Sequence, residues 1–342
     1  MTAGVSKELN IHSQTVQNVC KQYVKSRVQH KKPWLRWRGR TSLGWIPFNT
    51  GVTFDGEAFT FRGVRYEPMH LRKGIEYPTS CTGGCFSQDA RGRWYINIVV
   101  EVPIADQAPV SRVGIDLGLK ALATLSDGGE IAIPQFYRNS EATLATTQRA
   151  RKTRRIRNIH ARIANRRKDF LHKKSAEIVK QYGLVVVGDV SPSKLAKTRL
   201  AKSVLDAGWA GFKHMLSYKA IARGGMCLEV SEAFTTQTCS ECGCIAGPRG
   251  CAGLNKRMWQ CSACGEVHSR DTNSAKNILR IGLDTLAEGA SALKQGETPA
   301  FRPGSSHSAP DLILLSSIPS RPLGCMPIAR QVATVQGDKC LR

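Results

Sequence analysis

Hydrophobic residues follow two different periods in the first third of the chain. In residues 1–30 they recur every three to five positions, which predicts two short helices with Ser13 as a candidate cap. A helix-turn-helix that reads DNA is an alternative for this stretch, although nothing marks one face as base-reading. Over 32–104 apolar and polar residues alternate, with Asp55 and Gly56 at a turn. This part predicts a small antiparallel sheet or barrel.

Strands and helices alternate from residue 112 onwards. Residues 112–133 predict an apolar strand that ends on Asp116, then a second strand and a hairpin. Residues 184–190 predict another buried strand, which is followed by a long helix and by a strand at 226–234. Such alternation is typical of an α/β layer. An acid at the end of a central strand, followed at once by a hairpin, is how ribonuclease-H-like folds open.

The segment 149–174 predicts a helix with a cationic ridge. It holds twelve Lys and Arg but a single acid, Asp169, while Ile156, Ile159 and Ile163 keep helical spacing. A charge run is often only a solvated face, but so many cations should repel one another unless an anion lies nearby. We therefore expect nucleic acid to contact the basic residues Arg149, Arg151, Lys152, Arg154, Arg155, Arg157, Arg162, Arg166, Arg167 and Lys168.

The composition of the chain also favours nucleic acid as the partner. The chain has 342 residues and a formal charge of +24, from 50 Lys and Arg against 26 Asp and Glu, which is too basic for an ordinary metabolic enzyme. Its hydrophobic fraction of 41% is sufficient for a folded core. No apolar run approaches the ~20 residues of a membrane span, and the N-terminus lacks the pattern of a signal peptide. We therefore expect an intracellular protein without membrane contact.

Six of the twelve cysteines lie in the 26 residues between 239 and 264, with a CxxC pair at each end. Two such pairs offer four thiolates to one tetrahedral zinc ion, whereas a long basic chain without a signal peptide is a poor candidate for disulfides. Gly243 and Gly265 follow the pairs, where a knuckle needs positive φ. Cys244 and Cys251 are expected to be spectators, and His268 is a weak alternative ligand. The predicted ligands of a structural Zn²⁺ are Cys239, Cys242, Cys261 and Cys264.

Acidic residues fall at strand ends or at a helix start in the α/β part of the chain. The first of these acids is Asp116 and the last is Asp271. Between them, three acids are candidates for the middle position. Hydrolysis of a phosphodiester in a basic groove needs divalent cations held by such carboxylates. The three candidates for the middle position are Asp189, Glu229 and Glu232.

Three phrases occur in one order: GIDLGLKALATLSDG, then FTTQTCSECG at the first CxxC pair, then RDTNSAKNIL. Over residues 105–290 the chain thereby resembles the RuvC-like nucleases of the TnpB (OrfB) family from insertion sequences. The resemblance implies an RNA-guided DNA endonuclease, related to compact type V CRISPR effectors, with guide RNA and target DNA as partners. It also implies catalytic Mg²⁺ or Mn²⁺ and a location in the prokaryotic cytoplasm, associated with the nucleoid.

The family's first and third RuvC acids fall on Asp116 and Asp271. Most members place the second acid, a Glu, at the end of the central strand, where this chain has Gly188. Some relatives carry a relocated Glu, and Glu232 lies just before FTTQTC, with one residue between them. We therefore predict Asp116, Glu232 and Asp271 as the catalytic acids, with Asp189 in reserve; strand periodicity does not exclude Glu229.

The predicted fold class is α+β: an RNase-H-like (RuvC) α/β core with an inserted zinc-finger module, preceded by a small β-barrel with helices. The expected parts are a truncated helical and β-barrel nucleic-acid-binding region, the RuvC-like core, the zinc-finger insertion, the last RuvC segment and a disordered tail, at 1–105, 106–232, 233–268, 269–290 and 291–342. Family members usually begin with further elements. A nuclease-inactive or truncated relative that only binds nucleic acid is therefore the alternative function. A third reading is a strand-transferring transposase, which would share the RNase-H-like acids. Single-strand tyrosine chemistry is not expected, because no catalytic tyrosine with a His-x-His companion is visible.

Overall fold

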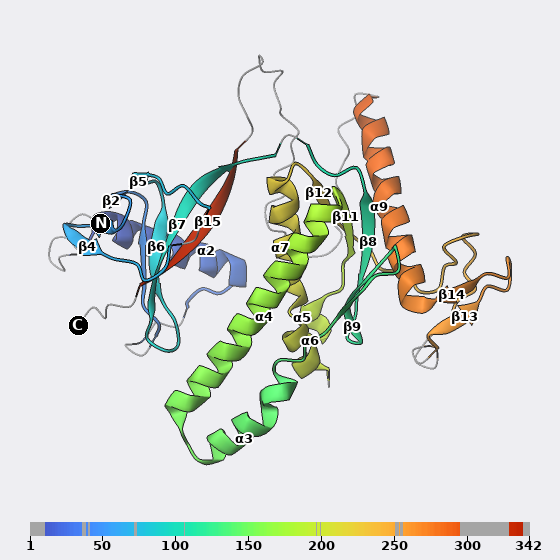
Figure 1. Cartoon of the computed structure of the whole chain (residues 1–342), viewed down its shortest axis with the longest axis horizontal. Helices are drawn as coiled ribbons and strands as arrows, with labels where there is room; N and C mark the ends of the chain where they lie inside the picture. Colours follow the sequence, from blue (N-terminus) through green and yellow to red (C-terminus); the bar gives the residue numbers. More distant parts are fainter. Residues whose placement is uncertain are drawn as a thin grey trace. The chain divides into compact units, whose positions relative to one another are not determined.

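The chain divides into two compact units, residues 1–103 with 304–342 and residues 104–303, whose elements are shown in Figure 1. The computed structural model describes residues 11–35, 39, 42–71, 74–105, 107–195, 197–198, 200–249, 253, 256–294 and 328–337. Each unit has a hydrophobic core of its own.

The first unit is built from two four-stranded antiparallel sheets, with strand orders β1-β6-β7-β15 and β4-β3-β2-β5. Alternate residues of these short strands enter a core that contains Phe48, Phe59 and Ile98. The prediction of short antiparallel strands over 32–104 is confirmed. The strands are β1 (Trp45–Phe48), β2 (Val52–Phe54), β3 (Phe59–Phe61), β4 (Val64–Tyr66), β5 (Ser80–Cys81), β6 (Gly84–Gln88), β7 (Trp94–Pro103) and β15 (Ile328–Gly337).

The N-terminal part forms one helix, α2 (Ser13–His30), within the described residues. The prediction of two short helices extends into residues 1–10, which lie outside the described part of the chain. Ser13 is the first helical residue and not a cap, because His12 holds the N-cap position. The buried Thr15 hydroxyl donates a hydrogen bond to the Pro47 carbonyl oxygen at 2.8 Å, which attaches α2 to β1.

Strand β15 lies in the tail for which the sequence predicts no regular structure. It pairs antiparallel with β7 over ten residues, from Ile328 opposite Pro103 to Gly337 opposite Trp94. The prediction is wrong over this stretch, because pairing at a free sheet edge uses backbone groups that every residue carries.

The second unit contains a five-stranded mixed sheet, ordered β10-β9-β8-β11-β12. Strands β8, β11 and β12 are parallel, whereas β9 and β10 continue from β8 as antiparallel hairpins. The carboxyl ends of the three parallel strands therefore meet at one edge of the sheet. The strands are β8 (Arg112–Leu117), β9 (Ala121–Leu125), β10 (Glu130–Ala132), β11 (Leu184–Gly188) and β12 (Met226–Val230).

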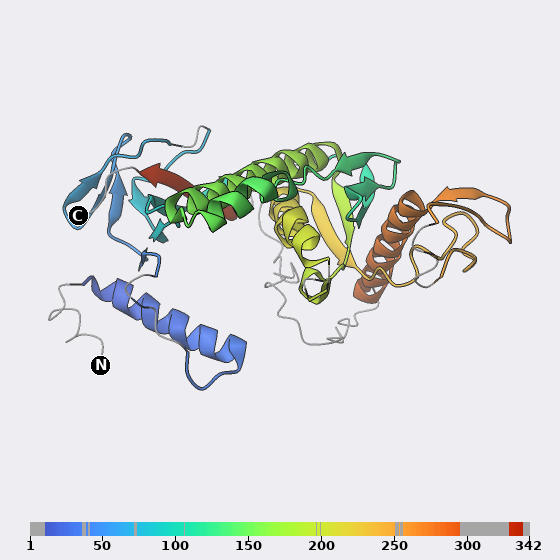
Figure 2. The same cartoon turned by 90° about the horizontal axis from the view of Figure 1, so that it is seen from below.

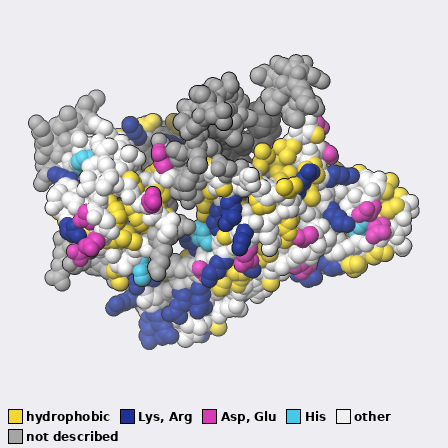
Figure 3. All heavy atoms as spheres, turned by 45° about the horizontal axis from the view of Figure 1, so that its top comes forward, with side chains coloured by type: hydrophobic (Ala, Val, Ile, Leu, Met, Phe, Trp, Pro, Cys, Tyr) yellow, Lys and Arg dark blue, Asp and Glu magenta, His cyan; other side chains and the backbone are white. Residues whose placement is uncertain are grey.

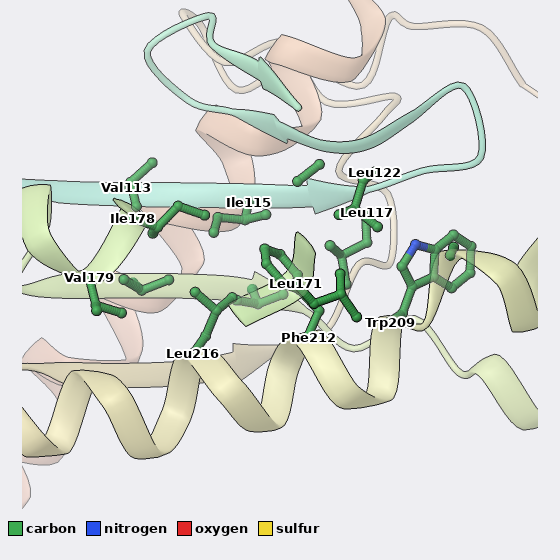
Figure 4. Packing of buried hydrophobic residues seen from close by; sticks show 14 of the residues in the cluster. Val113, Ile115, Leu117, Leu122, Leu171, Ile178, Val179, Trp209, Phe212 and Leu216 are labelled. Carbon is green, nitrogen blue, oxygen red and sulfur yellow. The ribbon is translucent and has the colours of Figure 1, made fainter. Parts of the chain in front are cut away.

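Helices cover both faces of this sheet. Helices α4 (Thr153–Gln181) and α7 (Trp209–Ala222) pack on one face, where Figure 4 shows Ile115, Leu171 and Phe212 converging. Helix α9 (Arg270–Lys294) covers the other face, with Ile278 buried against β11 and β12.

Helix α9 approaches β8 very closely. A Cβ atom at Gly114 would lie 2.1 Å from the Ala275 carbonyl oxygen, so only glycine permits this contact. Because strand side chains alternate, Ile115 faces α4 and α7 while Asp116 faces α9. The packing of α9 thereby determines which groups surround Asp116.

The remaining elements include one difference from the predicted pattern. The long helix expected around 204–216 is two helices, because Gly208 adopts a φ of 71° and ends the first of them. The shorter elements are η1 (Arg138–Ser140), α3 (Glu141–Arg149), α5 (Pro192–Leu195), α6 (Ala201–Ala207), β13 (Met258–Gln260) and β14 (Val267–Ser269). Among the helices of the described residues, none combines the length and hydrophobicity that a membrane crossing requires.

Candidate active site and metal centre

Three carboxylates gather at the carboxyl edge of the five-stranded sheet. Asp116 lies near the end of β8, Glu232 follows β12 by two residues, and Asp271 is in the first turn of α9. The charges of Glu232 and Asp271 both act on the Asp116 carboxylate. The structure therefore brings together the three acids that the sequence analysis selects.

The Glu232 side chain occupies the space next to Gly188. A Cβ atom on Gly188 would lie 2.0 Å from Glu232 Oε1 and 2.4 Å from its Cγ. Gly188 is the last residue of β11, which is the neighbour of β8 in the sheet. The carboxylate of Glu232 thus reaches the strand end where the sequence lacks an acid.

Burial makes the negative charge of this cluster costly. Burial, followed by the charges of Glu232 and Asp271, raises the pKa of Asp116 to about 8. Burial, followed by the charge of Asp189, raises the pKa of Glu232 to about 7. Glu232 Oε1 is buried and accepts no hydrogen bond within the described residues. A cation with oxygen ligands, such as Mg²⁺ or Mn²⁺, fits such a set of donors.

The two other candidates for the second acid make different contacts. Asp189 is exposed and accepts a hydrogen bond from the Glu232 backbone N–H at 3.2 Å, so it holds the backbone of Glu232 in place. Glu229 forms an ion pair with Lys213 of α7, on the sheet face opposite to α9. Its carboxylate therefore points away from Asp116.

Two further residues contact the acids, and motif reading does not single them out. Arg257 Nη1 lies 3.0 and 3.1 Å from the two carboxylate oxygens of Asp271. The side chain of Ser274, which is fully buried, acts on the carboxylate of Asp116 and lowers its pKa, against the effect of burial. Ser274 could have been found from its position one turn after Asp271 on a predicted helix, whereas Arg257 precedes β13 and carries no local signal.

The four predicted cysteine ligands form a compact group. The sulfur atoms of Cys239, Cys242, Cys261 and Cys264 all lie within 4.8 Å of one another. Among the described residues, these four are the His, Cys, Asp or Glu side chains whose ligand atoms lie close enough together to hold one metal ion. The three carboxylates do not lie this close to one another, and Asp271 forms an ion pair with Arg257.

The two CxxC pairs have matching knuckle geometry. Gly243 N–H and Gly265 N–H donate to the carbonyl oxygens of Cys239 and Cys261, each at 2.9 Å, and both glycines have a φ of 77°. The positive φ predicted for these glycines is confirmed. Backbone N–H groups of Cys264 and Ala263 lower the pKa of Cys261 to about 7, which favours the thiolate that binds metal.

The other candidates near this centre lie outside the four-sulfur group. Cys244 is exposed, and its carbonyl oxygen accepts the Cys239 N–H. His268 is buried, with Nε2 3.0 Å from Cys239 Sγ, so it contacts one of the four sulfur atoms and is not itself part of the group. Cys251 lies outside the described residues.

The predicted cationic helix is present as α4, with different bounds. It begins at Thr153 and not at residue 149, because Arg149 ends α3, and it extends to Gln181, beyond the predicted end. No acid lies in its first turn. A hollow of about 420 Å³ at this end is lined by Arg151, Lys152, Arg154 and Arg155 among others. Figure 3 shows Lys and Arg side chains gathered at the lower edge of the view, at the end where α3 and α4 meet in Figures 1 and 2. Nine of the ten named residues are exposed: Arg149, Arg151, Lys152, Arg154, Arg155, Arg157, Arg162, Arg166 and Lys168.

Arg167 is the exception among the ten. Its Nη2 donates to Asp206 Oδ1 at 2.9 Å, and the Asp206 side chain is only 3% exposed. The second oxygen of Asp206 accepts the Tyr137 N–H. Arg167 therefore joins α4 to α6 and is unavailable to a ligand in this arrangement.

Comparison with known proteins matches the chain to two family models. One, OrfB, is described as "Probable transposase" and matches residues 95–199; the other, described as "Cas12f1-like, TNB domain", matches residues 209–278. A Streptomyces pristinaespiralis protein named "Putative RNA-guided DNA endonuclease" is 36% identical over 272 residues, which cover 72% of this chain and 66% of the relative.

Two more proteins are similar to parts of the chain. The Escherichia coli protein InsQ, with the same description, is 32% identical over 66% of this chain and 61% of its own length. The solved structure of a Cas12f1-sgRNA-target DNA complex covers 72% of this chain and 69% of that chain, with 17% identity and a TM-score of 0.38. The chain thus spans about two thirds or less of the length of these two curated relatives. The matching family models and the named relatives show that the chain belongs to the OrfB (TnpB) family of transposon-associated proteins.

Proposed function

We propose that this chain is an RNA-guided DNA endonuclease that hydrolyses phosphodiester bonds with a RuvC-type, metal-dependent site. The observation that carries the proposal is the Glu232 carboxylate, which lies over Gly188 beside Asp116. The hairpin that follows the central strand β8 supports an RNase-H-like core. The names of the relatives support an endonuclease that uses guide RNA on target DNA.

Asp116, Glu232 and Asp271 would hold Mg²⁺ or Mn²⁺. When bound, such cations activate a water molecule and neutralise the leaving oxygen of the phosphodiester. The protein's own groups prepare the site: Ser274 orients the Asp116 carboxylate, and Asp189 holds the Glu232 backbone. Arg257 forms an ion pair with Asp271 in the first turn of α9.

The four cysteines would hold one structural Zn²⁺. Four thiolates complete a tetrahedral shell, so no ligand position is left open for a water molecule or a substrate. The ion would fix the segment 233–268, whose β13 and β14 form only a two-stranded sheet. Two strands of three residues rarely hold together without such a crosslink.

The exposed cations of α3 and α4 would bind the phosphates of RNA or DNA. The N-terminal end of an α-helix is itself positive, and α4 adds several cations but no acid there. The clustered positive charges repel one another unless a polyanion is bound. Contacts of this kind fix orientation and affinity, while base pairing with a guide would supply sequence choice.

The catalytic assignment is tested by Glu232→Ala against Asp189→Ala. The assay measures cleavage of target DNA, with a library of flanking sequences, by protein carrying its co-purified RNA. We expect Glu232→Ala to lower the cleavage rate by roughly 10²–10³-fold, because a carboxylate that contacts the metal is lost, while binding is unchanged. Asp189→Ala should keep most activity, and Glu229→Ala should match wild type.

If Asp189→Ala abolishes cleavage while Glu232→Ala remains active, the assignment of Glu232 is wrong. If the wild-type protein binds RNA and DNA but never cuts any target, the binding-only alternative replaces the nuclease.

The zinc proposal is tested by elemental analysis of Cys261→Ser beside Cys244→Ser. The wild type and Cys244→Ser should each contain one zinc per chain, because Cys244 is exposed and outside the four-sulfur group. Cys261→Ser should lose the metal and the ordered structure of 233–268. Folded wild-type protein without zinc would overturn the proposal.

The role of α4 is tested by reversing three of its charges, Arg154, Arg155 and Arg157, to Glu. Affinity for RNA should depend less steeply on salt, with the slope of log K against log salt smaller by about 2–3, since each lost phosphate contact removes roughly 0.7–0.9. The matched control reverses Lys173, Lys174 and Lys180, two of which already pair with acids of the same helix. Equal slopes for the two triple variants would show that the basic end of α4 is only solvated.

A further inference from the structure

The segment 232–240 connects the candidate active site to the zinc centre. It begins at Glu232, contains Thr235 and Thr238, and reaches Cys239, the first metal-binding cysteine. In both Figure 1 and Figure 2 the zinc-centre strands project from the N-terminal end of α9. Whatever holds this segment against α9 therefore acts on both sites at once.

Two buried asparagines of α9 hold the segment by its backbone. Asn277 Nδ2 donates to the carbonyl oxygens of Thr235 and Thr238 at 2.9 and 2.7 Å. Asn273 Nδ2 donates to the same two oxygens at 3.2 and 2.8 Å, and its Oδ1 accepts the Ser240 N–H at 2.9 Å. Both side chains are only 1% exposed. Only an amide nitrogen can face two carbonyl oxygens, so the orientation of each side chain is fixed.

The network continues to the carboxylates. The Thr235 hydroxyl donates to the Glu232 carbonyl oxygen at 2.9 Å and lies 3.0 Å from the Ser274 hydroxyl oxygen. The Ser274 side chain in turn lies near the carboxylate of Asp116 and lowers its pKa, against the effect of burial. The asparagines, Thr235 and Ser274 are all buried, so these bonds are protected from competition by water.

The backbone between the two sites adopts an unfavourable conformation. Phe234, two residues after Glu232, has a φ of 63°, in the left-handed region that a bulky residue rarely occupies. Its side chain is 62% exposed, so packing of the ring does not account for this conformation. Strained backbone persists only where the surrounding contacts determine it. Here the Phe234 carbonyl oxygen accepts the N–H groups of Gln237 and Thr238, each at 2.9 Å, and the asparagines hold the backbone of the residues that follow.

We propose that Asn273 and Asn277 are positioning residues that place Glu232 at the metal site and join it rigidly to the zinc centre. The inference rests on the proposed function for the role of Glu232. It assigns the asparagine pair a task separate from contact with metal or substrate. The two asparagines lie two and six residues after Asp271, so helix α9 brings both side chains onto the face that contacts the segment 232–240.

The test uses the zinc-loaded full chain with Asn277→Asp, which keeps the side chain's size but turns a carboxylate oxygen toward the carbonyls. Ile278→Val is the matched control, because it trims the neighbouring buried residue without touching the network. Asn273→Ala provides a second variant that retains the Asn277 bonds. Two measurements are made: hydrogen exchange of the amides in 232–240, and Mn²⁺ affinity from the paramagnetic resonance signal of free Mn²⁺.

We expect exchange at least tenfold faster and Mn²⁺ binding about tenfold weaker in Asn277→Asp, with one zinc still bound. Asn273→Ala should change both in the same direction, and Ile278→Val neither. Unchanged exchange in both asparagine variants, or equal effects in Ile278→Val, would overturn the proposal. Failure of the proposed function is separable: Asp116→Asn would then leave Mn²⁺ affinity at the wild-type value, while the exchange measurement still decides whether the asparagines hold the segment.

Discussion

The absence of a side chain at Gly188 is the constraint on which the candidate active site depends. A Cβ at this position would overlap the Glu232 side chain, so Glu232 can keep its present position over the strand end only while residue 188 is glycine. The carboxylate reaches the carboxyl edge of the sheet from a different segment than the strand itself. A buried acid beside Asp116 is costly without a counter-charge, and this cost suits a site that takes a divalent cation.

Helix α9 organises everything else at this edge. Within two turns it supplies the acid Asp271, the Ser274 hydroxyl beside Asp116, and the two asparagines that hold the segment leading to the zinc centre. Its close approach to β8 over Gly114 is what places these groups within reach. The segment that carries Cys239 and the acid cluster are therefore both held by the same helix.

Much of this arrangement follows from local patterns in the sequence. Strand alternation places Asp116 at a strand end, and CxxC spacing with a following glycine identifies the four cysteines. The assignment of Glu232 needs a further inference: the strand end at Gly188 lacks an acid, so the acid has to come from another segment. That Asp116 and Glu232 share an edge follows from the parallel pairing of β8, β11 and β12, whereas Asp271 reaches it through the packing of α9.

The rest depends on contacts between distant residues. The ion pair between Arg167 and Asp206 removes one cation from the exposed face, and no local pattern distinguishes Arg167 from its neighbours. The contact of Arg257 with Asp271 and the pairing of β15 with β7 have the same non-local character. Gly208 was visible in the sequence, but a glycine within a helical pattern does not by itself reveal that it takes a positive φ.

The central claim is that the Glu232 carboxylate takes the place of an acid at position 188, and moving the acid tests it most directly. In the Glu232→Ala background the space over β11 is free, so adding Gly188→Glu should restore cleavage of target DNA to at least tenfold above Glu232→Ala alone. Gly188→Glu with Glu232 retained should lose activity and stability, because two side chains then compete for one space. A double variant no more active than Glu232→Ala, together with an undisturbed Gly188→Glu single variant, would contradict the account.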